Sequence, residues 1–215
     1  MTDFTDLLDG YGRFRSSEYR RHRARWDELS EGQSPRVMVI ACSDSCVDPA
    51  QVFDTVPGEI FVVRNVANLV PPFEVGGGRH GVSAALEFAV TQLEVPEIVV
   101  MGHGACGGVS AALSRRFEGE APGAGGFIAH WVDMLDEARD RIIAQHGNGP
   151  EAVRALELET VRVSIANLRS FPFVAEREAA GTLTLHGAYF AIADGVLHVM
   201  DETGAFAPAA PIAAA

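Results

Sequence analysis

Two short apolar runs, at 37–40 and 98–101, are each followed at once by side chains that can bind a metal. Continuous apolar runs of this length, rich in β-branched residues, predict buried strands. The carboxyl ends of parallel strands meet at one edge of an open α/β sheet, which is where such sheets place their chemistry. We therefore expect the side chains that follow the two runs to converge. They are a thiol and a carboxylate after the first run, and an imidazole and a thiol after the second: Cys42, Asp44, His103 and Cys106.

Two thiols, an imidazole and a carboxylate can together complete a tetrahedral zinc site. Cys42 and Asp44 are two residues apart, so a bend at the strand end allows both to reach one metal. His103 and Cys106 are three residues apart, and the neighbouring glycines permit the unusual backbone angles of a metal-binding loop. The third cysteine, Cys46, also lies beside the first motif, whereas a structural disulfide framework would scatter the cysteines more widely.

Strand-like and helix-like segments alternate along the chain, which favours an α/β fold with a central, mostly parallel sheet, an antiparallel edge strand and flanking helices. The last two predicted strands are joined through Asp194-Gly195, a pair that favours a hairpin turn. We expect one domain over 1–205 and a disordered tail over 206–215, which is mostly Ala and Pro without apolar periodicity. The predicted strands are 36–41, 59–64, 97–101, 182–186 and 196–200. The predicted helices are 16–30, 81–93, 109–117, 127–146 and 151–170.

The composition narrows the classes of partner. A formal net charge of -12 argues against binding to nucleic acid or to an anionic membrane surface. All 17 basic residues are arginine, which excludes Schiff-base chemistry by a lysine side chain. The first six residues have neither a basic start nor an apolar core segment, and no apolar run approaches the roughly 20 residues needed to span a bilayer. We therefore expect a cytoplasmic protein.

The two motifs resemble those of the β-class carbonic anhydrases, whose zinc motif reads Cys-x-Asp-x-Arg followed much later by His-x-x-Cys. The corresponding segments here are Cys42-Ser43-Asp44-Ser45-Cys46 and His103-Gly104-Ala105-Cys106. The stretch 57–72 and the two glycines after Cys106 also look like the family, and the resemblance runs from about residue 33 to 201.

The resemblance implies a lyase that reversibly hydrates carbon dioxide to bicarbonate and a proton. It implies one zinc ion per chain, with Cys42, His103 and Cys106 as the permanent ligands. Asp44 matches the carboxylate that either accepts a hydrogen bond from zinc-bound water or displaces that water as the fourth ligand.

The resemblance also implies a substrate pocket shared between subunits. Gln33 matches a glutamine that the neighbouring subunit supplies, which implies a homodimer or a higher even-numbered homo-oligomer. The helical segment 16–30 is then an N-terminal arm that packs across the interface. Phe61, Val66 and Phe88 match other pocket positions of the plant-like members, although their own sequence context is that of ordinary core residues.

Position 46 departs from the family pattern, because Cys46 stands where the motif has arginine. That arginine holds the aspartate off the metal through a charge-assisted pair, which a neutral thiol cannot form. We therefore expect Asp44 to coordinate the metal and the catalytic pair of positions 44 and 46 to be weakened. Three interpretations of Cys46 stay open: a tolerated substitution in a weakened enzyme, a metal ligand or disulfide partner of Cys42, and the mark of a changed substrate such as carbonyl sulfide or carbon disulfide.

Two other functions stay possible. The chain could be a catalytically silent zinc-binding protein, or, less well matched by the cysteine spacing, a thiol redox protein. Some members of the family hold an inhibitory bicarbonate with a tryptophan where this chain has Val39, so we expect no such switch. We expect Arg64 to form a salt bridge at the dimer interface.

Overall fold

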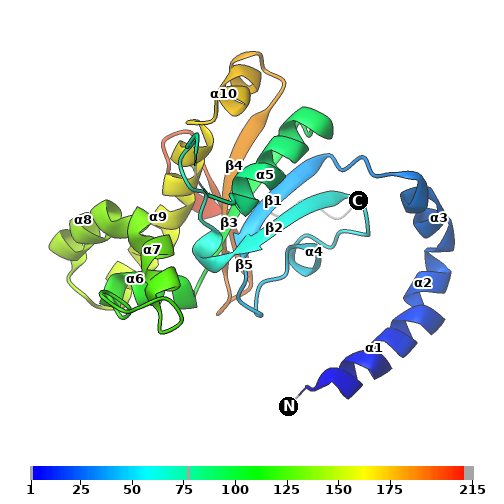
Figure 1. Ribbon diagram of the computed structural model, residues 1–215, viewed down its shortest axis with the longest axis horizontal. Helices are drawn as coiled ribbons and strands as arrows, with labels where there is room; N and C mark the ends of the chain where they lie inside the picture. The colour runs from blue at the N-terminus through cyan, green and yellow to red at the C-terminus, as the bar shows by residue number, and fades with distance from the viewer. Residues whose placement is uncertain (1, 77, 211–215) are drawn as a thin grey trace.

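A six-stranded sheet forms the centre of the computed structural model, which describes residues 2–76 and 78–210 (Figure 1). The strand order is β2-β1-β3-β4-β5-β6. The first four strands in this order are parallel, and the pairs β4–β5 and β5–β6 are antiparallel. The expected α/β fold with a mostly parallel sheet and an antiparallel edge is confirmed. The strands are β1 (Val37–Cys42), β2 (Ile60–Asn65), β3 (Glu97–His103), β4 (Thr184–Ala191), β5 (Val196–Met200) and β6 (Phe206–Pro208).

Helices cover both faces of the sheet, so the central strands are buried on both sides. Along β1, Met38 and Ile40 lie in one cluster of buried side chains, whereas Val39 and Ala41 lie in the other. This alternation follows from the two-residue period of a strand, and it explains why the run is apolar throughout. The helices of the body are α4 (Pro49–Val52), η1 (Val66–Asn68), α5 (Gly81–Glu87), η2 (Phe88–Gln92), α6 (Gly107–Ser114), α7 (Gly126–Val132), η3 (Asp133–Leu135), α8 (Asp136–His146), α9 (Pro150–Leu168) and α10 (Pro172–Ala179).

The N-terminal segment is a helical arm that leads away from the body (Figure 1). It consists of α1 (Phe4–Ser16), α2 (Glu18–Arg21) and α3 (Arg23–Glu31), so it begins earlier and is more broken than the single predicted helix. Helix α1 buries no residue, and it carries large exposed apolar side chains at helical spacing. They are Phe4, Leu7, Leu8, Tyr11 and Phe14.

The C-terminal edge of the sheet differs from the prediction. Phe206–Pro208 forms β6, because Phe206 pairs with Met200 in an antiparallel register, and the Phe206 ring packs under the Arg162 guanidinium at 5.2 Å. The prediction of a disordered tail is therefore wrong for these residues, and its last five positions, 211–215, lie outside the described residues. The division into one domain over 1–205 and a tail stays a prediction.

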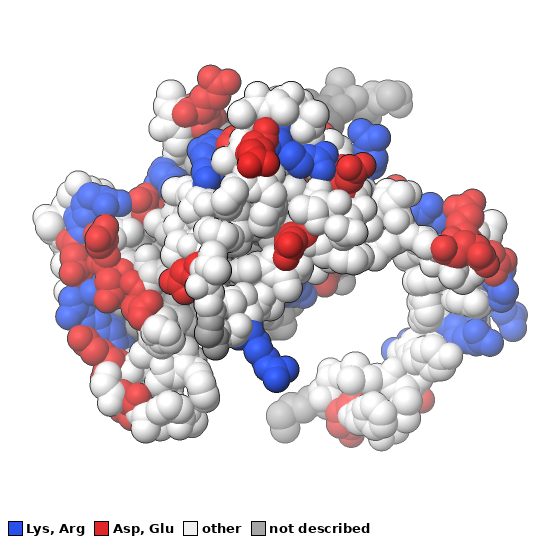
Figure 2. Space-filling view, turned by 45° about the horizontal axis from the view of Figure 1, so that its top comes forward, with Lys and Arg blue, Asp and Glu red and all other residues white. Residues whose placement is uncertain are grey.

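Acidic and basic side chains interleave on the arm, along the top of the body and at the side opposite the arm (Figure 2). Fewer charged side chains lie in the central part of this view. Among the described residues, no helix combines the length and the apolar character that crossing a bilayer requires.

Candidate metal centre

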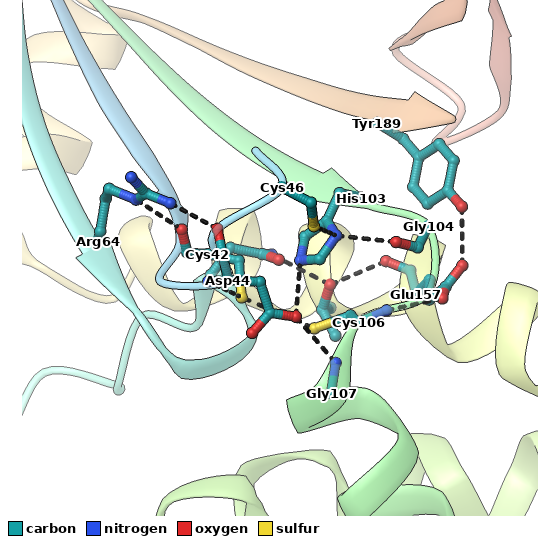
Figure 3. A network of polar contacts seen from close by, with 12 residues as sticks. Cys42, Asp44, Cys46, Arg64, His103, Gly104, Cys106, Gly107, Glu157 and Tyr189 are labelled. Carbon is teal, nitrogen blue, oxygen red and sulfur yellow. Dashed lines mark hydrogen bonds and ion pairs between the residues drawn. The ribbon is translucent and has the colours of Figure 1, made fainter. Parts of the chain in front are cut away.

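The two ligand motifs meet because β1 and β3 are neighbouring parallel strands. Cys42 is the last residue of β1 and His103 is the last residue of β3, so the loops that follow leave the same edge of the sheet. One donor atom from each of the four predicted ligands lies within 4.8 Å of the others. The Cys42 and Cys106 sulfur atoms are 3.8 Å apart (Figure 3). The expected convergence of Cys42, Asp44, His103 and Cys106 is confirmed.

The imidazole of His103 is oriented toward this cluster. Its Nδ1 lies 2.9 Å from the Gly104 carbonyl oxygen, which can only accept, so Nδ1 carries the proton and donates it. Nε2 then has a free lone pair, and it is buried without a hydrogen-bond partner in the described part of the chain. A buried polar atom without a partner costs free energy, whereas a metal ion at this position would satisfy it.

The two buried thiols interact strongly with one another. Hydrogen bonding from the Cys106 thiol lowers the pKa of Cys42 to about 4, although burial raises it. The Cys42 sulfur, together with burial, raises the pKa of Cys106 above its ordinary value. A metal ligand must be deprotonated, so a divalent cation that binds both sulfurs would displace any remaining thiol proton. The donor set of two sulfurs, one imidazole and one carboxylate therefore suits a metal of borderline softness such as zinc.

Asp44 is held at the edge of the cluster by the start of helix α6. Its Oδ2 accepts a hydrogen bond from the Gly107 N–H at 3.0 Å, and the same oxygen lies 3.6 Å from Nε2 of His103. Exposed N–H groups at a helix N-terminus favour a carboxylate. Sequence reasoning missed this donor, because a main-chain N–H has no signature in the residue type.

Cys46 lies beside the cluster and not in it. Its side chain is exposed, and its sulfur is 4.0 Å from Nδ1 of His103. All three cysteines are free in the described structure, so it does not contain the considered disulfide with Cys42. No cation replaces the family arginine, because the described residues place no arginine in an ion pair with the Asp44 carboxylate.

Arg64, at the end of β2, instead holds the main chain of the first ligand loop. Its guanidinium donates to the carbonyl oxygens of Cys42 at 2.8 Å and Asp44 at 2.6 Å (Figure 3). It also forms a salt bridge with Asp48 at 3.1 Å. Arg64 thus has a salt-bridge partner within its own chain, and the expected salt bridge at a dimer interface stays a prediction.

Of the four predicted pocket residues, the structure places only Val66 next to the cluster. Its side chain lies 2.6 Å from the position that a Cβ at Gly108 would take, at the start of α6. Phe61 and Phe88 stack on each other with ring centroids 6.0 Å apart, but Phe61 pairs with Met38, well before the carboxyl end of β1. Val66 and Phe88 are 38% and 45% exposed, so neither is an ordinary core residue.

Gln33 follows the arm and is exposed. Phe61 and Phe88 thus lie together away from the carboxyl end of β1, and the assignment of Phe61, Phe88 and Gln33 to a pocket stays a prediction.

The fold and the cluster together define an α/β protein in which a Cys-Asp-His-Cys cluster that fits a metal ion lies at the carboxyl ends of parallel strands. The sequence model of the family described as carbonic anhydrase matches residues 37–197. This match covers both ligand motifs and most of the sheet. The chain therefore belongs to the carbonic anhydrase family, in its β-class, a family of lyases.

Individual relatives agree over nearly the whole chain. Beta carbonic anhydrase 3 of Arabidopsis thaliana is 33% identical over 198 residues, which are 91% of this chain and 76% of that protein. The structure of the beta-carbonic anhydrase CcaA is 29% identical, with a TM-score of 0.87, over 97% of this chain and 92% of that chain. A structure from a study of two tetrameric beta-carbonic anhydrases of Sordaria macrospora is 26% identical, with a TM-score of 0.78, over 96% of this chain and 98% of that one.

Proposed function

We propose that the chain binds one zinc ion through Cys42, His103 and Cys106 and catalyses the reversible hydration of carbon dioxide to bicarbonate and a proton. The observation that carries this proposal is the four-donor cluster around the unpartnered, buried Nε2 of His103. Membership of the carbonic anhydrase family supports the choice of reaction.

Zinc bound at such a centre acts as a Lewis acid and lowers the pKa of a water molecule toward neutrality. The chain's own residues set the conditions for this chemistry. The Gly104 carbonyl oxygen fixes the tautomer of His103, so that Nε2 faces the two sulfurs. Cys42 and Cys106 supply the negative charge that the ion requires. The proposed role of Asp44 is to accept a hydrogen bond from the reacting group or to act as the fourth ligand. Cys46 weakens this arrangement, because a neutral thiol cannot form the charge-assisted pair that the family arginine forms with the aspartate.

The apolar side chain of Val66 beside the cluster suits carbon dioxide, which has no charge and accepts hydrogen bonds only weakly. We further propose that Gln33, Phe61 and Phe88 of a second subunit complete this pocket. Two observations support a homodimer or a higher even-numbered oligomer: the apolar, exposed face of α1, and the tetrameric state named for the Sordaria macrospora relatives. The cytoplasmic location and the absence of nucleic-acid or membrane partners stay predictions.

The proposal is tested by assaying one zinc-quantified sample with three substrates. Carbon dioxide hydration is followed by stopped-flow with a pH indicator, and carbonyl sulfide and carbon disulfide hydrolysis by release of sulfide. We expect about one zinc ion per chain and hydration of carbon dioxide as the dominant activity. Sulfide release faster than hydration would assign the chain to the alternative hydrolase function. Full zinc occupancy with none of the three activities would mean a catalytically silent zinc-binding protein.

A further inference from the structure

The second ligand loop has a backbone conformation that must be held in place. Ala105, between His103 and Cys106, has a φ of 57°, in the left-handed region that residues other than glycine adopt only at a cost of about 1–2 kcal/mol. The loop also packs closely on β4, since a Cβ at Gly104 would lie 2.8 Å from the Tyr189 hydroxyl. Contacts outside the loop must therefore compensate for this conformation.

Glu157, on helix α9, makes such a contact. Its side chain is buried, with the residue only 3% exposed, yet it is not one of the four clustered donors. Oε1 accepts a hydrogen bond from the Cys106 N–H at 3.3 Å, and Oε2 accepts one from the Tyr189 hydroxyl at 2.7 Å (Figure 3). Burial raises the pKa of Glu157, while the N–H groups of Cys106 and Ala105 lower it. A carboxylate is costly to bury, so its hydrogen bonds must be well made.

Tyr189 is itself fixed from the other side. It lies on β4 and is buried, and the Arg154 guanidinium stacks over its ring at 3.5 Å. Arg154 and Glu157 are three residues apart on α9, so one helix surface supports both the carboxylate and the tyrosine that donates to it. The carboxylate therefore has little freedom to move.

We propose that Glu157 is a positioning residue, which holds the Cys106 end of the ligand loop so that the sulfur of Cys106 and Nε2 of His103 face the same metal ion. This inference rests on the proposed metal-binding function. The two ligand loops are then held in complementary ways. Arg64 donates to carbonyl oxygens of the first loop, and Glu157 accepts from an N–H of the second. Both carboxylate oxygens of Glu157 accept hydrogen bonds from Cys106 and Tyr189, so we propose no contact between Glu157 and the substrate.

The test compares Glu157→Ala, Glu157→Gln and a control on the same helix, Ser164→Ala. Ser164 is also buried, and it bonds to the main chain of Asn68 and Val70 instead of the ligand loop. Two readouts report on the centre itself: the rate at which a chelator removes zinc, and the absorption spectrum of the cobalt-substituted protein. Both are compared with the free energy of unfolding.

We expect Glu157→Ala to lose zinc about tenfold faster or more and to shift the cobalt bands, because partners of metal ligands are typically worth that much in metal affinity. Glu157→Gln keeps an acceptor for the Cys106 N–H, so it should remain within about threefold of the parent. Ser164→Ala should lower stability without changing either readout. If Glu157→Ala does not fold, Tyr189→Phe takes its place and should accelerate zinc loss by a smaller factor.

Parental zinc release and parental cobalt bands in the variant tested would overturn the positioning role while leaving carbon dioxide hydration by the parent untouched. Equal acceleration in Ser164→Ala would also overturn it, because the effect would then follow stability alone. A parent chain that binds neither zinc nor cobalt would overturn the proposed function as well as this inference.

Discussion

Replacing Cys46 with arginine should raise the rate of carbon dioxide hydration about tenfold. The Asp44 carboxylate now has the Gly107 N–H as a donor at 3.0 Å, and the described structure pairs it with no arginine. Arg64 contacts only the main-chain oxygen of Asp44. The sulfur of Cys46 lies 4.0 Å from Nδ1 of His103, so the side chain of an arginine at this position would extend from beside the imidazole ring. It would hold the carboxylate and leave the fourth metal position open.

The size of the effect follows from charge and exposure. Two unit charges about 4 Å apart attract by about 4 kcal/mol at an effective dielectric constant of 20. Cys46 is exposed and Asp44 is half-buried, so solvent screens the pair, and exposed ion pairs are typically worth about 1 kcal/mol or less. A bidentate arginine pair is stronger than this typical value. A net change of about 1.4 kcal/mol, equivalent to tenfold in rate, lies between these limits.

The assay is stopped-flow hydration of carbon dioxide, with rates expressed per bound zinc. Cys46→Ser is the matched control, because it removes the thiol and adds no charge. We expect the serine variant to behave as the parent does. A Cys46→Arg variant no faster than the parent would mean that the missing cation does not limit the rate. A serine variant as fast as the arginine variant would show that the thiol itself is the limiting feature.

Three further predictions concern the arm, the first ligand loop and pH. Leu8→Asp, in the exposed apolar stripe of α1, should shift the protein toward monomers in analytical ultracentrifugation and reduce hydration activity, whereas an active monomeric parent would contradict the shared pocket. Arg64→Ala should lower the free energy of unfolding by about 2 kcal/mol in denaturant titrations, because it removes two charge-assisted hydrogen bonds to the loop main chain; an unchanged midpoint would contradict this. Hydrogen bonds from Thr203 and from the Ala205 N–H lower the pKa of Asp201. The ionised Asp201 should therefore stabilise the folded protein fully above its unfolded-state pKa, and this contribution should be lost as pH falls through the lower folded-state pKa. Asp201→Asn should remove this acid-dependent part of the stability curve, and identical pH profiles of parent and variant would count against it.

The ligand cluster could be predicted from sequence because both halves of it are local patterns. Each apolar run is followed within two residues by a predicted ligand, which is the last residue of the observed strand. The strands β1 and β3 pair in parallel, as strand–helix alternation favours. Successive side chains of β1 lie alternately in the two buried clusters, which follows directly from a run that is apolar on both faces of the strand. These features depend on short-range spacing and on the two-residue period of strands.

The contacts that hold the cluster could not be predicted in this way. The donor to Asp44 is the main-chain N–H of Gly107, and the acceptor for the Cys106 N–H lies on a helix 51 residues further along the chain. The Phe206 strand was missed because its pairing with Met200 depends on a turn of the chain, whereas the tail's composition alone indicates disorder. The proposed pocket roles of Gln33, Phe61 and Phe88 involve a second subunit, and the sequence pattern of one chain does not indicate how two chains pack.

Titrating zinc into the metal-free protein while measuring hydration by stopped-flow would decide whether zinc at the Cys-Asp-His-Cys centre hydrates carbon dioxide. We expect activity that rises in proportion to bound zinc and stops rising at about one ion per chain. The same titration of Cys106→Ser should yield no activity. Activity without zinc would contradict the proposed role of the metal. So would a fully loaded protein that never exceeds the uncatalysed rate between about pH 7 and pH 9.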